Sequence, residues 1–311
     1  MSRLHLEDRA KLTRSAAIAS IITAVFLASL KIWATWQTNS TAMLGSLADT
    51  GLDLIASVAT LVGVWIAAQP ADEDHRFGHG KAEALAAMFQ VILIALSAAG
   101  IAFRSIQHLA VGQETAAANE GIAVSLIAIA ATFGLLAWQR HVIKRTGSLA
   151  ISTDHVHYKS DLFLNLAVIA ALVLDQYLGF SKADPLFGLA IAAWLAWGAW
   201  SAASEAVDHL MDREWPDERR DAFLEVLARH PDIRGVHDLR TRTSGMHDFV
   251  QFHMAVDPQL NIKQAHDLMD DVEERLAQEF PGVEVLIHPD PEGLVNEGGV
   301  AAEELLPDKE D

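Results

Sequence analysis

Two pairs of potential metal ligands recur at a four-residue spacing inside apolar segments of this chain. Asp49 precedes Asp53 by four positions, and His157 precedes Asp161 by four. Because residues four apart lie on one face of a helix, two such helices could present three carboxylates and an imidazole to a single point. Oxygen and nitrogen donors of this kind bind divalent cations such as Zn²⁺. The spacing therefore predicts a divalent-cation site formed by these four residues.

The segments around both pairs are hydrophobic enough to cross a bilayer. An ionised side chain in the hydrocarbon region costs about 2.5–3.5 kcal/mol on insertion scales, so a quartet of such groups needs compensation. A bound divalent cation supplies it. The alternative is a set of side chains that only form hydrogen bonds between helices. Two pairs at the same spacing favour the cation site.

Composition divides the chain into a membrane part and an acidic part. Hydrophobic residues make up 51% of the chain and the mean hydropathy is +0.21, yet the formal net charge is −18. Residues 1–207 carry 15 acids and 13 bases, whereas residues 208–311 carry 26 acids and 10 bases. The acidic part disfavours nucleic acid as a partner and favours cations. Because the chain has no cysteine, any metal site must use nitrogen and oxygen ligands.

Six apolar helices are predicted before residue 208, each near the ~20 residues that span ~30 Å of hydrocarbon. A cleavable signal peptide is not expected, because residues 1–14 are too charged and the first apolar run is too long. The helices are expected at approximately 14–37, 42–69, 82–109, 121–142, 159–178 and 185–206.

Basic residues predict the orientation of these helices, because cytoplasmic connections are enriched in Lys and Arg. The first, third and fifth connections contain a single base, Lys182. The N-terminal segment and the second and fourth connections contain many more, so both termini are expected in the cytoplasm. These bases are Arg3, Arg9, Lys11, Arg14, Arg76, Lys81, Arg140, Lys144 and Arg145.

The second connection, residues 70–81, concentrates acids and histidines. Asp72, His75 and His79 lie close together there, and Gly78 and Gly80 allow the backbone to bend around them. A second metal site is predicted in this loop. The alternative is a solvated polar loop whose histidines hold nothing.

The C-terminal third predicts a separate α+β domain over residues 208–291. The pattern is helix 216–229, strands 236–242 and 249–256, helix 262–280 and strand 283–287. This order is typical of a small ferredoxin-like sandwich. Residues 292–311 are acidic and rich in Gly and Ala, which predicts a disordered tail.

Histidines are dense in this domain as well. His237 and His253 would lie in neighbouring strands, and His288 and Asp290 would point to the same side of the last strand. With His266, they suffice for one or two nitrogen/oxygen sites of the zinc type. The alternative is that several of them only decorate the surface.

Four motifs, spread in order over nearly the whole chain, carry a resemblance to the cation diffusion facilitator family, in its bacterial zinc/iron exporter branch. They are Ser46–Asp53, Gln69–Glu83, His157–Asp161 and Gly235–Arg242. The resemblance implies a homodimer of six-helix transmembrane bundles in the bacterial inner membrane, each with a cytoplasmic metallochaperone-like domain. It also implies export of a divalent metal in exchange for protons, with Zn²⁺, and also Fe²⁺ or Cd²⁺, as candidate substrate and regulatory ligand.

The family's functional positions carry over residue by residue. Pro289 departs from the pattern, because the familiar close relative has glutamine there, and any role of that side chain in the cytoplasmic site is lost. The resemblance implies a transport site at Asp49, Asp53, His157 and Asp161, a loop site at Asp72, His75 and His79, a binuclear cytoplasmic site near the dimer interface at His237, His253, His266, His288 and Asp290, and a charge interlock between Lys81 and Asp212.

The predicted quartet favours transport over catalysis. Four protein ligands fill the tetrahedral shell of zinc and leave no position for a reactive water. Metal and protons compete for the same groups, and His157 is the main proton carrier in our hypothesis because imidazole titrates near neutral pH. Two other readings remain: an intramembrane metallohydrolase, for which the chain lacks a His-Glu-x-x-His motif, and a metal-independent exporter of organic cations.

Overall fold

The computed structural model describes residues 6–38, 41–111, 121–178, 182–293 and 305–306, with some helical side chains left out. Contacts divide the chain into two compact units, Met1–Asp208 and His209–Asp311. Parts of the three connections predicted to be poor in bases lie outside the described residues, as do Arg3 and most of the predicted tail. In the tail, Leu305 and Leu306 pack on the core of the second unit, and the Leu305 N–H donates to the Val236 carbonyl (2.9 Å).

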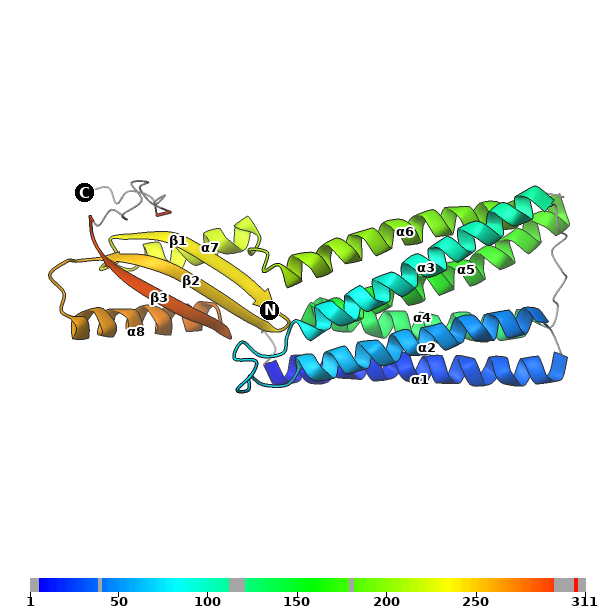
Figure 1. Cartoon of the computed structure of the whole chain (residues 1–311), viewed down its shortest axis with the longest axis horizontal. Coiled ribbons are helices and arrows are strands. Elements are labelled where there is room, and N and C mark those ends of the chain that lie inside the picture. The colour runs from blue at the N-terminus through cyan, green and yellow to red at the C-terminus, as the bar shows by residue number, and fades with distance from the viewer. Residues whose placement is uncertain (1–5, 39–40, 112–120, 179–181, 294–304, 307–311) are drawn as a thin grey trace. The chain divides into compact units, whose positions relative to one another are not determined.

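The first unit contains the six predicted helices, which run along one another (Figure 1). Five of the described helices are long and apolar enough to cross a membrane, and α5 falls short of that criterion. The helices are α1 (Leu6–Thr38), α2 (Thr41–Ala67), α3 (Ala82–Val111), α4 (Gly121–Thr146), α5 (Leu149–Leu178) and α6 (Ala183–Leu210).

Helix α5 begins earlier than the sequence pattern predicted. The expected start was Lys159, at the edge of the apolar run, but the helix starts at Leu149. The intervening residues include Asp154 and His157, which lower the local hydropathy. Both side chains are buried and hydrogen-bonded to other helices, so polar residues continue the helix inside the bundle.

The bundle has an apolar exterior and close internal contacts. Large hydrophobic side chains such as Leu96, Phe133 and Trp197 are exposed, as lipid-facing residues of a membrane domain would be. Inside, α2 and α3 approach so closely that a Cβ on Gly63 would lie 2.3 Å from the Cβ of Ala86. Small residues at helix contacts permit this approach.

Helix α6 packs on α3 and α5. Leu195 and Ala199 join Ile94 in one buried apolar cluster between α3 and α6. On the other contact, the rings of Phe163 and Trp194 meet edge to face with centroids 5.1 Å apart. Helix α5 therefore contacts both α6 and α2, the helix that carries Asp49 and Asp53.

The second unit is the predicted α+β domain. It comprises α7 (Asp217–Ala228), β1 (Gly235–Ser244), β2 (His247–Val256), α8 (Ile262–Glu279) and β3 (Val283–Pro291). The sheet order is β1-β2-β3; β1 and β2 are antiparallel, while β2 and β3 are parallel and joined through α8. The predicted order of elements is confirmed, with bounds that differ by a few residues.

One hydrophobic core holds both helices of this unit to the sheet. Phe223 of α7, Phe252 of β2 and Leu276 of α8 are almost completely buried in it. Helix α8 begins with a capping box in which Asn261 Oδ1 accepts from the Gln264 N–H and Gln264 Oε1 accepts from the Asn261 N–H, both at 3.0 Å. The core therefore supports the sheet on which the predicted cytoplasmic ligands lie.

Candidate metal centres

The structure brings three of the four intramembrane ligands together. His157 Nε2 on α5 lies 2.9 Å from Asp53 Oδ1 on α2. Asp161 completes a group whose ligand atoms all lie within 4.8 Å of one another. Asp49 is on α2, one turn before Asp53, but its side chain lies outside the described residues. The predicted helix pair therefore does converge on one point.

These three ligands line a cavity of about 560 Å³ inside the bundle. Its walls also carry apolar side chains such as Leu27 and Ile94, and two cations, Lys31 and Arg104. His157 is buried, with a side chain that is 6% exposed, and that of Asp53 is 15% exposed. A mixed carboxylate and imidazole set of this kind suits a transition-metal cation as substrate.

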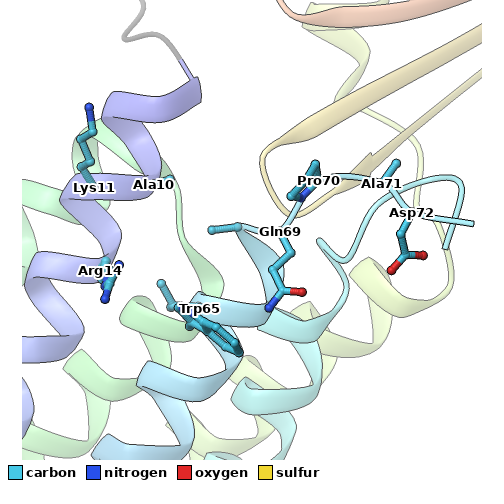
Figure 2. A pocket seen from close by; sticks show the side chains of 10 residues that line it. Ala10, Lys11, Arg14, Trp65, Gln69, Pro70, Ala71 and Asp72 are labelled. Atoms are coloured by element: carbon cyan, nitrogen blue, oxygen red, sulfur yellow. The ribbon is translucent and has the colours of Figure 1, made fainter. Parts of the chain in front are cut away.

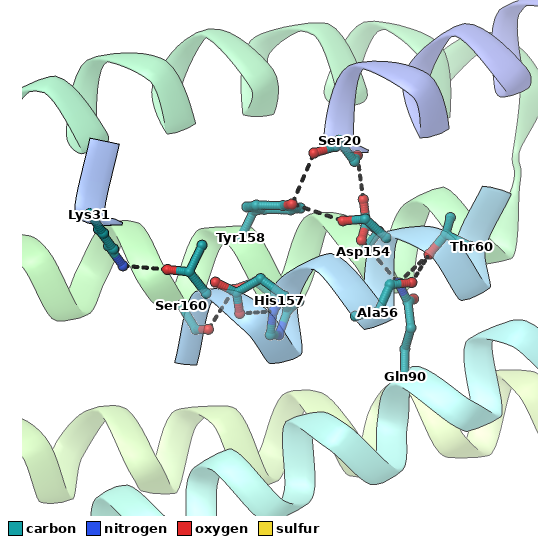
Figure 3. Close-up of polar contacts among 12 residues, drawn as sticks. Ser20, Lys31, Ala56, Thr60, Gln90, Asp154, His157, Tyr158 and Ser160 are labelled. Carbon is teal, nitrogen blue, oxygen red and sulfur yellow. Dashed lines mark hydrogen bonds and ion pairs between the residues drawn. The ribbon is translucent and has the colours of Figure 1, made fainter. Parts of the chain in front are cut away.

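A further carboxylate, that of Asp154, lies one turn before His157 on α5 (Figure 3). Asp154 is completely buried and accepts hydrogen bonds from Ser20 Oγ (2.6 Å), Gln90 Nε2 (2.9 Å) and Gln139 Nε2 (2.8 Å). These donors come from α1, α3 and α4. One side chain thus ties α5 to three other helices.

The neighbouring Tyr158 links α5 to α1 and α2. Its hydroxyl donates to the Ser20 carbonyl (3.2 Å) and lies 2.8 Å from Ser57 Oγ. Ser57 is one turn after Asp53, so this contact lies beside the cation site.

Sequence reasoning missed this buried network. A signal was nevertheless present: Asp154 is three positions before His157, which places both on one helix face. An acid in a membrane helix is moreover a functional candidate by default.

The loop after α2 also gathers its predicted ligands. Asp72 Oδ1 accepts from the backbone N–H groups of His75 (2.6 Å) and Asp74 (3.0 Å). These bonds, that of His75 foremost, hold the pKa of Asp72 below its usual value. The imidazoles of His75 and His79 lie 3.4 and 3.3 Å from the same carboxylate, and Gly78 has φ +76°. The three ligand atoms lie within 4.8 Å of one another.

A cavity of about 570 Å³ lies between this loop and the ends of two helices (Figure 2). Lys11 and Arg14 of α1, Trp65 of α2 and Asp72 of the loop line it. The loop therefore lies at the same end of the bundle as the start of α1. By the distribution of basic residues, that is the end predicted to face the cytoplasm.

In the second unit, three histidines form a row across the sheet. His237 pairs with His253, and His253 with His288, on adjacent strands. Asp290 Oδ2 lies 3.2 Å from His237 Nε2 and 2.8 Å from His253 Nδ1, while its Oδ1 lies 3.3 Å from His288 Nε2. His237, His253 and Asp290 form a group with ligand atoms within 4.8 Å.

A bulge follows the first histidine of this row. The register of β1 shifts between His237 and Arg240, and Asp238 adopts φ +53°. Such bulges re-aim side chains at strand edges and next to sites. Pro289 lies opposite Met254 in the β2–β3 ladder, between the two β3 ligands.

Two further predictions are not tested by this geometry. His266 is on α8, with its Nδ1 3.8 Å from Asp270 Oδ1, and is not a member of the close group. Lys81 and Asp212 belong to different units, so the interlock stays a prediction; Asp212 Oδ2 lies 3.7 Å from Arg242 in its own unit.

Family models match almost the whole chain. Residues 17–211 match the cation efflux transmembrane domain, and residues 215–292 match the cytoplasmic domain of cation efflux proteins. The chain belongs to the cation diffusion facilitator family.

Relatives extend this assignment to the YiiP/FieF type of facilitator. The cation-efflux pump FieF of Serratia proteamaculans is 42% identical over 289 residues, which cover 93% of this chain and 96% of the relative. FieF of Klebsiella pneumoniae is 42% identical over 285 residues, covering 92% and 95%. A solved structure of CzrB, described as a candidate zinc transporter, is 37% identical over 25% of this chain and 99% of its own, with a TM-score of 0.25.

As a member of the cation diffusion facilitators, the protein is a membrane-spanning cation efflux transporter and not an enzyme. This assignment replaces the metallohydrolase reading of the intramembrane ligands. It agrees with the geometry, in which acidic and imidazole groups converge inside an apolar bundle.

Proposed function

We propose that this facilitator exports Zn²⁺ from the cytoplasm in exchange for protons, and that Asp49, Asp53, His157 and Asp161 bind the cation during transport. The observation that carries the proposal is that ligand atoms of Asp53, His157 and Asp161 lie within 4.8 Å of one another at a cavity of the bundle. The imidazole favours zinc, and also Cd²⁺ or Fe²⁺, over magnesium and manganese, which prefer oxygen shells.

Proton coupling follows from the chemistry of the ligands. Zn²⁺ binds neutral imidazole and ionised carboxylates, so each proton that binds these groups weakens metal binding. His157 Nε2 lies 2.9 Å from Asp53 Oδ1. This nitrogen can take part in that hydrogen bond or bind the metal, but it cannot do both at once. If the bundle exposes the site alternately to each side, protons from outside displace the metal outward.

The other two clusters extend the proposal. The protein acts as a homodimer in the bacterial inner membrane. The loop group at Asp72, His75 and His79 binds metal at the end of the bundle that we assign to the cytoplasm. The group at His237, His253 and Asp290 senses cytoplasmic metal. A ligand shifts an equilibrium only toward the state that it binds more tightly, so bound metal favours the docked soluble dimer. His266 and His288 are further ligands in that assembly.

The test is Zn²⁺ uptake into proteoliposomes with an imposed pH gradient. Wild-type protein is compared with Asp53→Asn, which keeps the shape of the side chain but removes a charged ligand. Glu205→Gln is the matched control, because Glu205 is an exposed acid on α6 away from the site. We expect gradient-dependent flux in wild type and control, and almost none in Asp53→Asn. Persistent flux in that variant would mean that the site lies elsewhere.

A further inference from the structure

A lysine lies within the apolar part of α1. Lys31 falls inside the candidate membrane span Glu7–Ala34. A charged group at membrane depth is costly, so such residues usually face the bundle interior and pair with polar partners. Lys31 is only partly exposed, which agrees with an inward position.

The ammonium group of Lys31 joins α1 to α2 beside the cavity of the cation site. Its Nζ donates to Thr50 Oγ1 at 2.5 Å, and Thr50 is buried on α2 next to Asp49 in the chain. Lys31 also lines the cavity that contains Asp53 and Asp161. Helix α1 thus places a basic side chain in the wall of the cavity that carboxylates of α2 and α5 also line.

We propose that Lys31 is a built-in counter-ion of the intramembrane cation site and sets how readily the transported metal leaves it. The inference rests on the proposed transport function of that site. The three carboxylates carry three negative charges, which one divalent cation and the Lys31 ammonium balance. Arg104, the other basic residue of the cavity wall, is exposed to the surroundings of the bundle. Because the ammonium is tethered to α1, it remains when the metal departs and offsets part of the exposed negative charge.

This role has a definite kinetic consequence. Like charges repel, so a fixed ammonium weakens metal binding and lowers the barrier to release. Without it, the site holds the metal more tightly and releases it more slowly. The KM for Zn²⁺ and the maximal rate should therefore both fall, which a loosened fold would not produce.

The experiment measures KM and maximal rate of Zn²⁺ uptake into proteoliposomes for the full chain under a fixed pH gradient. Lys31→Met removes the charge and keeps most of the length. We expect its KM to fall about tenfold, as loss of one nearby charge in a partly screened site implies, with a lower maximal rate. Lys31→Arg restores wild-type values. Lys144→Met, at an exposed position near the end of α4, is the control and changes neither.

A second variant covers the case in which Lys31→Met does not fold. Lys31→Gln also removes the charge but keeps a donor for a hydrogen bond, and it should give the same fall in KM. An unchanged or raised KM in the folded neutral variants would overturn the counter-ion role. That outcome is distinct from failure of the proposed function, which would appear as absent flux in wild type or undiminished flux in Asp53→Asn.

Discussion

The imidazole of His157 joins α5 to α2, with its Nε2 2.9 Å from Asp53 Oδ1. A metal that binds through Nε2 must replace this hydrogen bond. A second contact links the same two helices. Tyr158, the residue after His157, places its hydroxyl oxygen 2.8 Å from Oγ of Ser57, which lies one turn after Asp53 on α2. The site is thus held together by polar contacts besides the bond that the cation breaks.

His157 should govern the pH dependence of transport. In His157→Gln, metal flux should fall and lose most of its dependence on pH between about 6 and 8, because amide groups do not titrate there. The measurement is the rate of Zn²⁺ uptake at a series of internal and external pH values. If metal binding is retained and the pH dependence is unchanged, another group carries the coupled proton.

Asp154 should be essential for the stability of the bundle. In Asp154→Ala, the donors Ser20, Gln90 and Gln139 lose a buried acceptor, which should cost roughly 3 kcal/mol. Asp154→Asn keeps one acceptor oxygen and should lose less. Thermal unfolding of the purified protein in detergent gives both values. Equal stability of wild type and Asp154→Ala would contradict the network that the structure shows.

The cytoplasmic cluster should control the response to metal. Combined His237→Ala and Asp290→Ala should reduce the number of Zn²⁺ ions bound per chain and remove any activation by cytoplasmic metal. The reason is that two of the three close ligands, His237, His253 and Asp290, are lost. Calorimetric titration and flux at varied cytoplasmic Zn²⁺ measure the two effects. His247→Gln, six residues from His253 along β2, is the control. Unaltered regulation with reduced binding would indicate a purely structural site.

The contact between His230 and Asp271 should make local stability depend on pH. His230 Nε2 lies 2.8 Å from Asp271 Oδ2, and this bond, with Arg275 nearby, lowers the pKa of the carboxyl group. A lowered folded-state pKa stabilises the fold above the unfolded value of about 3.9, and the contribution disappears as pH falls through the folded value.

Amide hydrogen exchange in α8 tests this contact in the full chain. Protection should be weaker in Asp271→Asn than in wild type at neutral pH, and the two should converge as the pH falls through the lowered folded-state pKa of the carboxyl group. Glu279→Gln, at the end of the same helix, should follow the wild type. A difference that persists unchanged into strong acid would exclude the ionised carboxylate as its source.

Local patterns predicted most of the architecture. The six described helices of the first unit, five of them apolar enough to cross a membrane, and the order of strands and helices after residue 216 are confirmed. Burial in a membrane or on one face of a sheet imposes a pattern on the sequence itself. The start of α5 was wrong for the same reason: hydropathy could not show that the polar residues before Lys159 find partners on other helices.

Prediction of the site was similarly divided. The four-residue spacing of Asp49 with Asp53 and of His157 with Asp161 indicated the donor types and the helix faces, and family motifs indicated the remaining clusters. The sequence placed His253 on a strand and His266 on a helix, but it did not indicate which of them lies beside Asp290. In the described chain His253 belongs to the close group and His266 does not. That distinction depends on which strands pair and where β1 bulges.

The sequence by itself determined the membrane class, the nitrogen and oxygen character of the metal ligands and their helical spacing, since these depend on residue type and short-range geometry. Only the tertiary structure decided three further features. Asp154 joins four helices, Lys31 lines the cation cavity and donates a hydrogen bond to Thr50, and Asp290 contacts three histidines. The physical reason is that a buried polar group must find its partner on a distant segment, and packing alone selects which segment that is.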